Sequence, residues 1–310
     1  MPTGTVIRLD TASCLVLCDG ERVRCPLPGR WRRRRGGQTR LIAVGDRVDV
    51  EVQANGEGTL GTAHPRHGGK LSRKAAGERD VEQVVASNVD QLVVVVAAED
   101  PPVNRRFLDR LVVSGEHGEL EVAVCVNKMD LAQSGAFEEL AALYAGLGYR
   151  TVLTSALTGM GVEELRGLLA GKTSVLAGPS GVGKSRLLMA VQPGLELRVS
   201  AVSSATGKGR HTTTAVSLLP LDVGGYVVDT PGVREFALFD MERDELKHYF
   251  PEMGRLFGQC NFGDCSHLHE PGCAVIAAVG AGGIAAERYE SYCRIYESLP
   301  EPDPARRNKR

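Results

Sequence analysis

One eight-residue stretch combines the residue types that hold a nucleotide phosphate. It follows the apolar run 174–177 and leads into 186–190, so it lies where a buried strand would turn into a helix. Its glycines let successive backbone N–H groups surround a β-phosphate, Lys184 brings a cation to the β and γ oxygens, and the Ser185 hydroxyl can bind magnesium. The nucleotide-binding residues predicted here are Gly178, Pro179, Ser180, Gly181, Val182, Gly183, Lys184, Ser185 and Arg186.

A second motif indicates which base is bound. An Asn-Lys-x-Asp sequence follows the apolar run 121–126. The Asp130 carboxylate would accept hydrogen bonds from N1–H and the N2 amino group of guanine, and adenine offers neither donor in that arrangement. Asn127 would contact the purine edge, Lys128 would lie across the ring, and the segment 154–156 is typical of the loop that supports guanine O6. The predicted base-binding residues are Asn127, Lys128, Met129, Asp130, Ser155 and Ala156.

Two later segments could bind magnesium and the γ-phosphate. The glycine-rich polar segment 207–214 ends in threonines, and Thr213 or Thr214 would complete the magnesium coordination begun by the phosphate loop. An apolar strand then ends in Asp-x-x-Gly. There Asp229 can hold magnesium through water, and the Gly232 N–H can meet the γ-phosphate.

A cluster of sulfur and nitrogen donors near the C-terminus predicts a metal site. Cys260, Cys265, His267 and Cys273 form a Cys₃His set within fourteen residues, which is enough for a closed tetrahedral zinc site. His269 is a competing ligand that spacing alone does not exclude. A closed site has no open coordination position, so we expect its role to be structural.

The elements around these motifs change character along the chain. Residues 1–75 are short alternating runs separated by glycine, proline and aspartate turns, which predicts a small five-stranded β-barrel. From residue 88, strands alternate with helices: 91–98 is a valine-rich strand of the kind buried on both faces of a parallel sheet, and 105–113 has helical spacing. We therefore expect a multidomain α/β protein.

The order of the nucleotide motifs is unusual. The guanine motif comes first, then the phosphate loop, the threonine segment and Asp-x-x-Gly, whereas ordinary GTPases begin with the phosphate loop. This order predicts a circular permutation, in which the usual last helix, near 162–169, runs into the usual first strand. Surface termini that lie close together make such rewiring tolerable.

Composition indicates how many domains the chain can form and in which cellular compartment it works. The chain has 310 residues, 43% of them hydrophobic, which is enough for two or three domains with cores of their own. It has no N-terminal signal pattern, and its longest apolar run, 92–98, is too short to span a bilayer. With a nucleotide loop in a long chain, the eight cysteines indicate metal binding in a reducing compartment rather than disulfides. We expect a cytoplasmic protein without membrane association.

Charge is concentrated at the N-terminus. Although the net charge is −1, residues 1–80 hold 15 lysines and arginines against 9 acidic residues. The segment 30–37 clusters arginines around Trp31, the only tryptophan, which favours RNA contact over a merely solvated loop. Residues 64–74 have no clear periodicity, and we expect a flexible linker or a second RNA-facing loop there.

Together these features resemble the small ribosomal subunit-dependent GTPase A family. The resemblance is carried by the permuted order and by four motifs: Gly-Pro-Ser-Gly-Val-Gly-Lys-Ser, Gly-Arg-His-Thr-Thr-Thr, Asp-Thr-Pro-Gly-Val-Arg-Glu-Phe and Cys-x₄-Cys-x-His-x₅-Cys. It implies an OB-fold RNA-binding domain at 1–80, a circularly permuted P-loop GTPase domain at 81–236 and a helical zinc-binding domain at 237–310. It also implies a role in late maturation of the small ribosomal subunit, which would stimulate hydrolysis, and it favours His267 over His269 as the fourth zinc ligand.

Further expectations concern catalysis and partners. Val233 stands where many GTPases have a water-orienting glutamine, and the resemblance suggests His211 as the catalytic substitute. The partners would be GTP and GDP, the small subunit and its rRNA, and other assembly factors, with the protein a monomer. The alternative is a GTP-gated RNA-binding assembly factor whose hydrolysis is incidental. A nucleotide kinase is disfavoured because it would not need the guanine motif.

Overall fold

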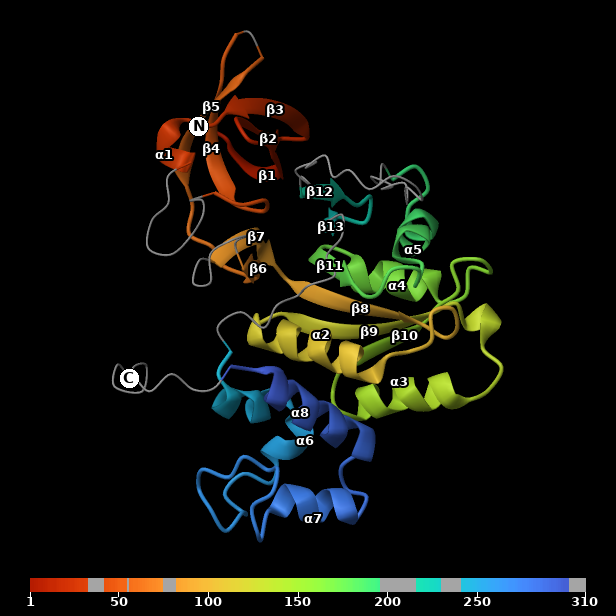
Figure 1. The fold of residues 1–310 in the computed structure, drawn as a ribbon. Coiled ribbons are helices and arrows are strands. Elements are labelled where there is room, and N and C mark those ends of the chain that lie inside the picture. Colours follow the sequence, from red (N-terminus) through yellow and green to blue (C-terminus); the bar gives the residue numbers. More distant parts are fainter. Residues whose placement is uncertain (33–41, 55, 75–81, 196–215, 230–240, 301–310) are drawn as a thin grey trace, which may run out of the picture.

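A central mixed sheet organises the molecule (Figure 1). The computed structural model describes residues 1–32, 42–54, 56–74, 82–195, 216–229 and 241–300. Within them, five parallel strands run side by side in the order β10-β9-β8-β11-β13, and β12 continues the sheet antiparallel to β13. The bounds are β8 Gln91–Ala97, β9 Glu121–Asn127, β10 Arg150–Leu153, β11 Thr173–Ala177, β12 Ser217–Pro220 and β13 Tyr226–Asp229.

Helices cover both faces of this sheet, as expected for strands that are apolar throughout. Every residue of β8 is buried. Two helices pack on one face and two on the other (Figure 1), so each face has its own apolar core. The helices are α2 Arg105–His117 and α3 Ala136–Gly146 on the first face, and α4 Val162–Leu169 and α5 Lys184–Val191 on the second.

The N-terminal strands form a closed barrel. Consecutive strands β1, β2 and β3 pair antiparallel, β4 pairs with β1 and β5, and a parallel bridge between Arg24 and Glu57 brings β3 to the start of β5. This connectivity and the short α1 before β4 are typical of an OB-fold. The bounds are β1 Thr3–Leu9, β2 Ser13–Cys18, β3 Glu21–Pro26, α1 Gly29–Arg32, β4 Arg47–Val52 and β5 Gly58–Ala63.

The barrel is joined to the central sheet by main-chain pairing. Strand β1 pairs antiparallel with β12, with Arg8 opposite Ser217, so barrel and nucleotide-binding sheet share one hydrogen-bonded ladder. Nothing in the local sequence pattern indicated this connection.

The expectation of a flexible linker or loop at residues 64–74 is wrong. Residues Gly69–Lys74 form strand β6, which pairs antiparallel with β7 (Glu82–Val89) in a separate two-stranded sheet. Ahead of β6, Arg66 donates two hydrogen bonds to the buried carboxylate of Asp46, at 2.7 and 2.9 Å. Arg66, one of the basic residues that could have contacted RNA, thus anchors the chain instead, which composition alone could not reveal.

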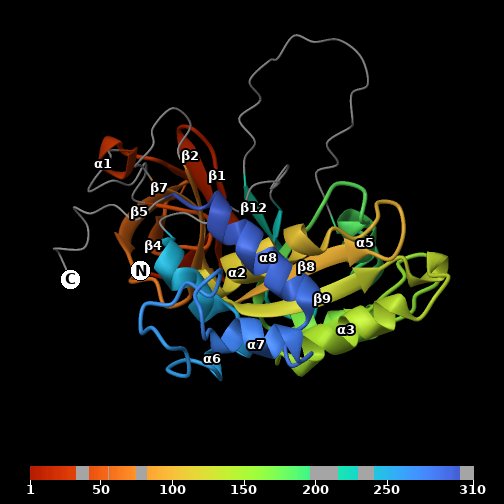
Figure 2. The same ribbon diagram turned by 60° about the horizontal axis from the view of Figure 1, so that its bottom comes forward.

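The C-terminal region is helical and packs against α2, as the view in Figure 2 shows for α8. Its apolar core includes Val113 of α2 together with Met241, Leu246, Phe250 and Tyr292. The elements are a 3₁₀ helix at Arg243–Tyr249, α6 Pro251–Gly254, α7 Ala274–Gly280 and α8 Ala286–Ser298. A barrel, a layered α/β sheet and a helical C-terminal region confirm the predicted multidomain α/β fold class.

Candidate nucleotide and metal sites

The predicted nucleotide motifs lie at the carboxyl ends of neighbouring parallel strands. The phosphate loop follows β11, the guanine motif follows β9, Ser155 and Ala156 follow β10, and Asp229 ends β13. Because all four strands run in the same direction, these segments meet at one edge of the sheet, where open α/β sheets bind their ligands.

The phosphate loop has the backbone geometry that its glycines allow. Gly181 and Gly183 have φ values of 89° and 94°, and α5 starts at Lys184 directly after them. The Lys184 ammonium donates to the carbonyl oxygens of Gly178 and Pro179, at 2.7 and 2.8 Å. The loop carbonyls therefore accept hydrogen bonds from the ammonium group. To bind phosphate oxygens, the Lys184 side chain would exchange these acceptors for the phosphate.

Asn127 connects the guanine motif to the phosphate loop. Its side chain is buried, and its Nδ2 donates to the Val182 carbonyl at 2.7 Å. Its Oδ1 accepts from the Ala156 N–H at 3.4 Å and from the Thr154 hydroxyl at 3.3 Å. The Asn127 amide thus holds these loops together, and its expected contact with the purine edge stays a prediction. Thr154 was expected only as part of the segment 154–156, and its hydrogen bond to Asn127 depends on β9 and β10 being adjacent.

Of the remaining guanine-motif side chains, Met129 packs against the apolar core, whereas Lys128 and Asp130 hydrogen-bond to neighbouring loops. Asp130 is exposed, and its Oδ1 accepts a hydrogen bond from the Ser155 hydroxyl. The Lys128 ammonium donates to the Asp100 carbonyl, which lies in the loop after β8. Asp130 therefore keeps a second carboxylate oxygen available, on a loop that its neighbours hold in place.

Part of the predicted site lies outside the described residues: His211, Thr213, Thr214 and Gly232. Of the other predicted ligands, Ser185 and Arg186 are exposed at the start of α5. Ser185 stands where a magnesium ion bound to the phosphates would need a hydroxyl, and the nucleotide would bring that ion with it.

The Cys₃His residues converge on one point, with one donor atom from each of Cys260, Cys265, His267 and Cys273 and all four atoms within 4.8 Å of one another. The Nδ1 atom of His267 lies 3.6 Å from the Cys260 sulfur and 3.4 Å from the Cys273 sulfur. This donor set fits zinc, because three thiolates and one imidazole are a known closed zinc ligand set. His269 is exposed and does not belong to the cluster.

The ionisation of the cluster suits a metal site. Burial, with Lys247 nearby, lowers the pKa of His267 and so keeps the imidazole neutral, which is the form that binds metal. Burial raises the pKa of the Cys265 thiol to about 12. Burial also opposes ionisation of Cys260, but hydrogen bonds, including one from the Ala274 N–H, lower its pKa below the usual value. A bound cation would be needed to hold all three sulfurs as thiolates.

The Glu270 carboxylate stabilises the backbone next to the predicted metal ligand His267. Glu270 accepts hydrogen bonds from the backbone N–H groups of Ser266, Leu268 and His269, at 2.7, 3.1 and 3.2 Å. The residue between them, His267, has a left-handed φ of 63°, which is unusual for a residue with a side chain. Glu270 therefore stabilises the backbone turn that presents His267, a role that donor spacing alone does not signal.

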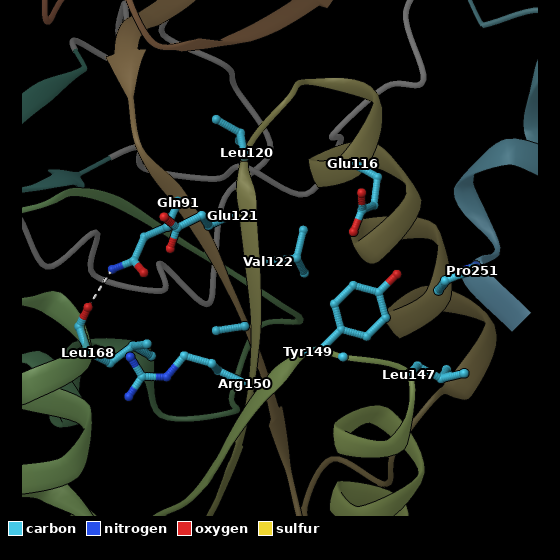
Figure 3. Close-up of a pocket in the computed structure, with 12 residues that line it drawn as sticks. Gln91, Glu116, Leu120, Glu121, Val122, Leu147, Tyr149, Arg150, Leu168 and Pro251 are labelled. Carbon is cyan, nitrogen blue, oxygen red and sulfur yellow. Dashed lines mark hydrogen bonds between the residues drawn. The ribbon is translucent and has the colours of Figure 1, made fainter.

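A separate cavity of about 280 Å³ lies at the opposite edge of the sheet, at the amino ends of β8 and β9 (Figure 3). Gln91, Glu116, Val122 and Tyr149 are among its lining residues. Burial raises the pKa of Glu116 above its usual value. Since the phosphate loop and guanine motif are at the other ends of these strands, the cavity is not the nucleotide site.

Comparison with known proteins adds the family context. The family model described as RsgA GTPase matches residues 63–239. A protein of Chlorobaculum tepidum named small ribosomal subunit biogenesis GTPase RsgA is 42% identical over 308 residues, covering 96% of this chain and 98% of the relative. A protein of the same name from Thermotoga maritima is 44% identical over 283 residues, covering 90% of each chain.

Solved structures agree with the sequence matches. The crystal structure of YjeQ from Thermotoga maritima superposes with a TM-score of 0.78 at 40% identity, covering 96% of this chain and 98% of that one. The structure of YloQ, described as a circularly permuted GTPase, has a TM-score of 0.73 at 29% identity and covers 97% of each chain. Within the described part of the chain, no helix is both long enough and apolar enough to cross a membrane.

Proposed function

This chain belongs to the RsgA GTPase family, and from that premise we propose that it hydrolyses GTP on the small ribosomal subunit during the subunit's late maturation. The observation that carries the proposal is the hydrogen bond from Asn127 to Val182, which joins the guanine-reading and phosphate-binding loops into one site. The curated relatives named above are small ribosomal subunit biogenesis GTPases, which supports that subunit as the partner.

In the proposed mechanism the base and the phosphates are held separately. Asp130 accepts two hydrogen bonds from guanine, and its neighbour Ser155 keeps the carboxylate oriented. Lys184 leaves the loop carbonyls for the β and γ oxygens, and the positive φ values of Gly181 and Gly183 turn backbone N–H groups towards the same phosphates. GTP is thereby fixed at both ends before the γ-phosphate is attacked.

Water attack on the γ-phosphate needs a group that orients the nucleophile. We assign this role to His211, because Val233 cannot hydrogen-bond a water. Thr213 or Thr214 together with Ser185 would hold magnesium, which supplies charge neutralisation at the phosphates when bound. Asp229 and Gly232 complete the set, and small-subunit rRNA would stimulate hydrolysis through contact with the segment that carries His211.

The remaining parts of the proposal concern the flanking regions and partners. The N-terminal domain at 1–80, which contains the OB-fold barrel, binds rRNA beside a GTPase domain at 81–236 and a zinc-binding domain at 237–310. Its arginine-rich segment around Trp31 supports the RNA role, and the donor set of Cys260, Cys265, His267 and Cys273 supports one structural zinc per chain. In this account the protein is a cytoplasmic monomer that works with other assembly factors.

Steady-state GTP hydrolysis with and without purified small subunits tests the proposal, with ATP and large subunits as controls. We expect strong stimulation by small subunits with GTP alone, and its loss in His211→Ala. Tight GTP-dependent binding to the subunit without stimulation would contradict the enzyme account and favour the gated assembly factor. Full stimulated turnover in His211→Ala would refute the catalytic assignment alone.

A further inference from the structure

We infer that helix α8 makes docking of the C-terminal region onto the nucleotide-binding domain depend on the metal loop, defined here as residues 260–273. The inference rests on the proposed metal site, though not on GTP hydrolysis. It concerns a part of the molecule that the nucleotide motifs do not touch.

One side of α8 holds the metal loop. The Tyr292 hydroxyl donates to the Ser266 carbonyl at 2.7 Å, and the Tyr289 hydroxyl donates to the His267 carbonyl at 2.8 Å. Both acceptors therefore belong to the turn that presents a predicted metal ligand. Tyr292 is only 1% exposed, so its hydroxyl would be left without a partner in an apolar setting if the loop moved away.

The same helix attaches to α2 through a buried charge cluster. The Arg288 guanidinium donates to the Asp109 carboxylate of α2 and, at 2.7 and 3.2 Å, to both oxygens of Glu252. Asp109 also accepts from the Tyr144 hydroxyl of α3. Burial alone would lower the pKa of Arg288, but Asp109 and Glu252 more than compensate, so its pKa lies above the usual value.

This cluster tolerates little displacement. Arg288 and Asp109 are each 1% exposed, and the guanidinium lies 4.6 Å from the Phe250 ring centroid. Breaking a buried ion pair leaves each charge buried without a partner, so that its desolvation cost is no longer compensated. A shift of α8 that separates Arg288 from Asp109 would therefore remove this buried attachment to α2.

The two attachments are adjacent along α8. Arg288 and Tyr289 are consecutive, and Tyr292 is one turn after Arg288 and packs edge-on against Phe250 at 5.3 Å. Between residues 259 and 273 the chain contains no helix or strand, so ligation rather than backbone pairing would have to fix the loop. Loss of the metal would remove the anchors of Tyr289 and Tyr292, and with them the position of Arg288.

The docking also bears on the nucleotide edge. Met241 follows Asp229, the last residue of β13, by twelve positions. It is buried in the same core as Val113 of α2. The position of the C-terminal region thus sets one end of the segment that contains Gly232.

Hydrogen exchange followed by mass spectrometry tests the inference on the full-length protein, zinc-loaded and after chelation, with metal content measured in each sample. We expect exchange in residues 105–117 and 286–298 to become several-fold to about thirtyfold faster without zinc, as for the loss of one or two kcal/mol. Strand β9 should stay protected. In the zinc-loaded protein, Tyr292→Phe should also speed exchange in these two helices. The control is Tyr296→Phe on the same helix α8, which should leave exchange unchanged, because the Tyr296 ring packs against Arg243.

Unchanged exchange in 105–117 after verified metal loss would overturn the inference, since docking would then be independent of the loop. Equal acceleration in β9 would overturn it too, because the metal would then support the whole fold. A protein that binds no metal would reject both the metal site and the inference while leaving the hydrolysis proposal intact. Subunit-stimulated turnover is measured separately, so its failure would not be mistaken for any of these outcomes.

Discussion

The Asn127 side-chain amide donates to the Val182 carbonyl at 2.7 Å, and this hydrogen bond links the loop that reads the base to the loop that holds the phosphates. The contact needs close approach. A methyl group placed on Gly183 would lie 2.4 Å from the Asn127 Nδ2 atom. Glycine at this position therefore serves the junction between the loops as well as the phosphate contact.

We accordingly expect Gly183→Ala to weaken GTP and GDP binding by at least about tenfold. The substitution forces a left-handed φ of 94° on a residue with a side chain, at a cost of about 1–2 kcal/mol, and displaces Asn127. Binding of a fluorescent nucleotide analogue measures the effect. Gly167→Ala in α4 is the matched control, because a methyl group there meets nothing within 4 Å. Equal affinity in both variants would show that the junction does not matter for binding.

Metal content should distinguish the two C-terminal histidines. His267→Ala should lose bound zinc and unfold at a lower temperature, because it removes one of four converging donors. His269→Ala should keep both zinc and stability, since His269 is exposed and outside the cluster. Elemental analysis with thermal unfolding reads out both effects. Zinc retained in His267→Ala and lost in His269→Ala would reverse the ligand assignment.

Glu116 should make the fold less stable as the pH rises. Burial raises its folded-state pKa, so the native state binds more protons than the unfolded chain between the two pKa values, and the free energy of unfolding falls through that window. Glu116→Gln, which keeps the shape of the side chain and removes its charge, should therefore be more stable than the parent at pH 7.5. Because the group is partly exposed, we expect less than about 1 kcal/mol.

The difference should vanish well below pH 4.3, the approximate pKa of an unperturbed glutamate. Denaturant unfolding at several pH values measures it, with the exposed Glu139→Gln on α3 as the control. A Glu116→Gln variant less stable than the parent at pH 7.5 would mean that the charged carboxylate is favourable where it lies.

Local spacing explains what the sequence could predict. The phosphate loop, the guanine motif and the Cys₃His set lie within short stretches, and helix α4 was expected at its observed bounds, Val162–Leu169. The permuted order follows from the order of the motifs, and the solved structure of YloQ agrees with it. Such features need no knowledge of which distant segments meet.

Contacts between distant segments explain the rest. Arg288 and Asp109 are 179 positions apart, and the pairing of β1 with β12 places Arg8 opposite Ser217, two residues that no periodicity of the sequence connects. Strand β6 escaped detection because it contains a single large apolar residue, Leu71, and depends on β7 for pairing. The contacts of Asn127 with Val182 and Ala156 could not be predicted, because these residues reach it only once the sheet is assembled.

The most direct test of guanine-specific hydrolysis at this sheet edge is subunit-stimulated turnover of GTP and XTP by the parent protein and Asp130→Asn. Asparagine would accept from N1–H and donate to the C2 carbonyl of xanthine, whereas it cannot accept from the guanine amino group as well. At about 1.5–3 kcal/mol for the charged hydrogen bond that is lost, we predict that GTP affinity falls about 10- to 150-fold and that XTP turnover appears. A folded Asp130→Asn that still prefers GTP, or that gains no XTP turnover, would contradict the account.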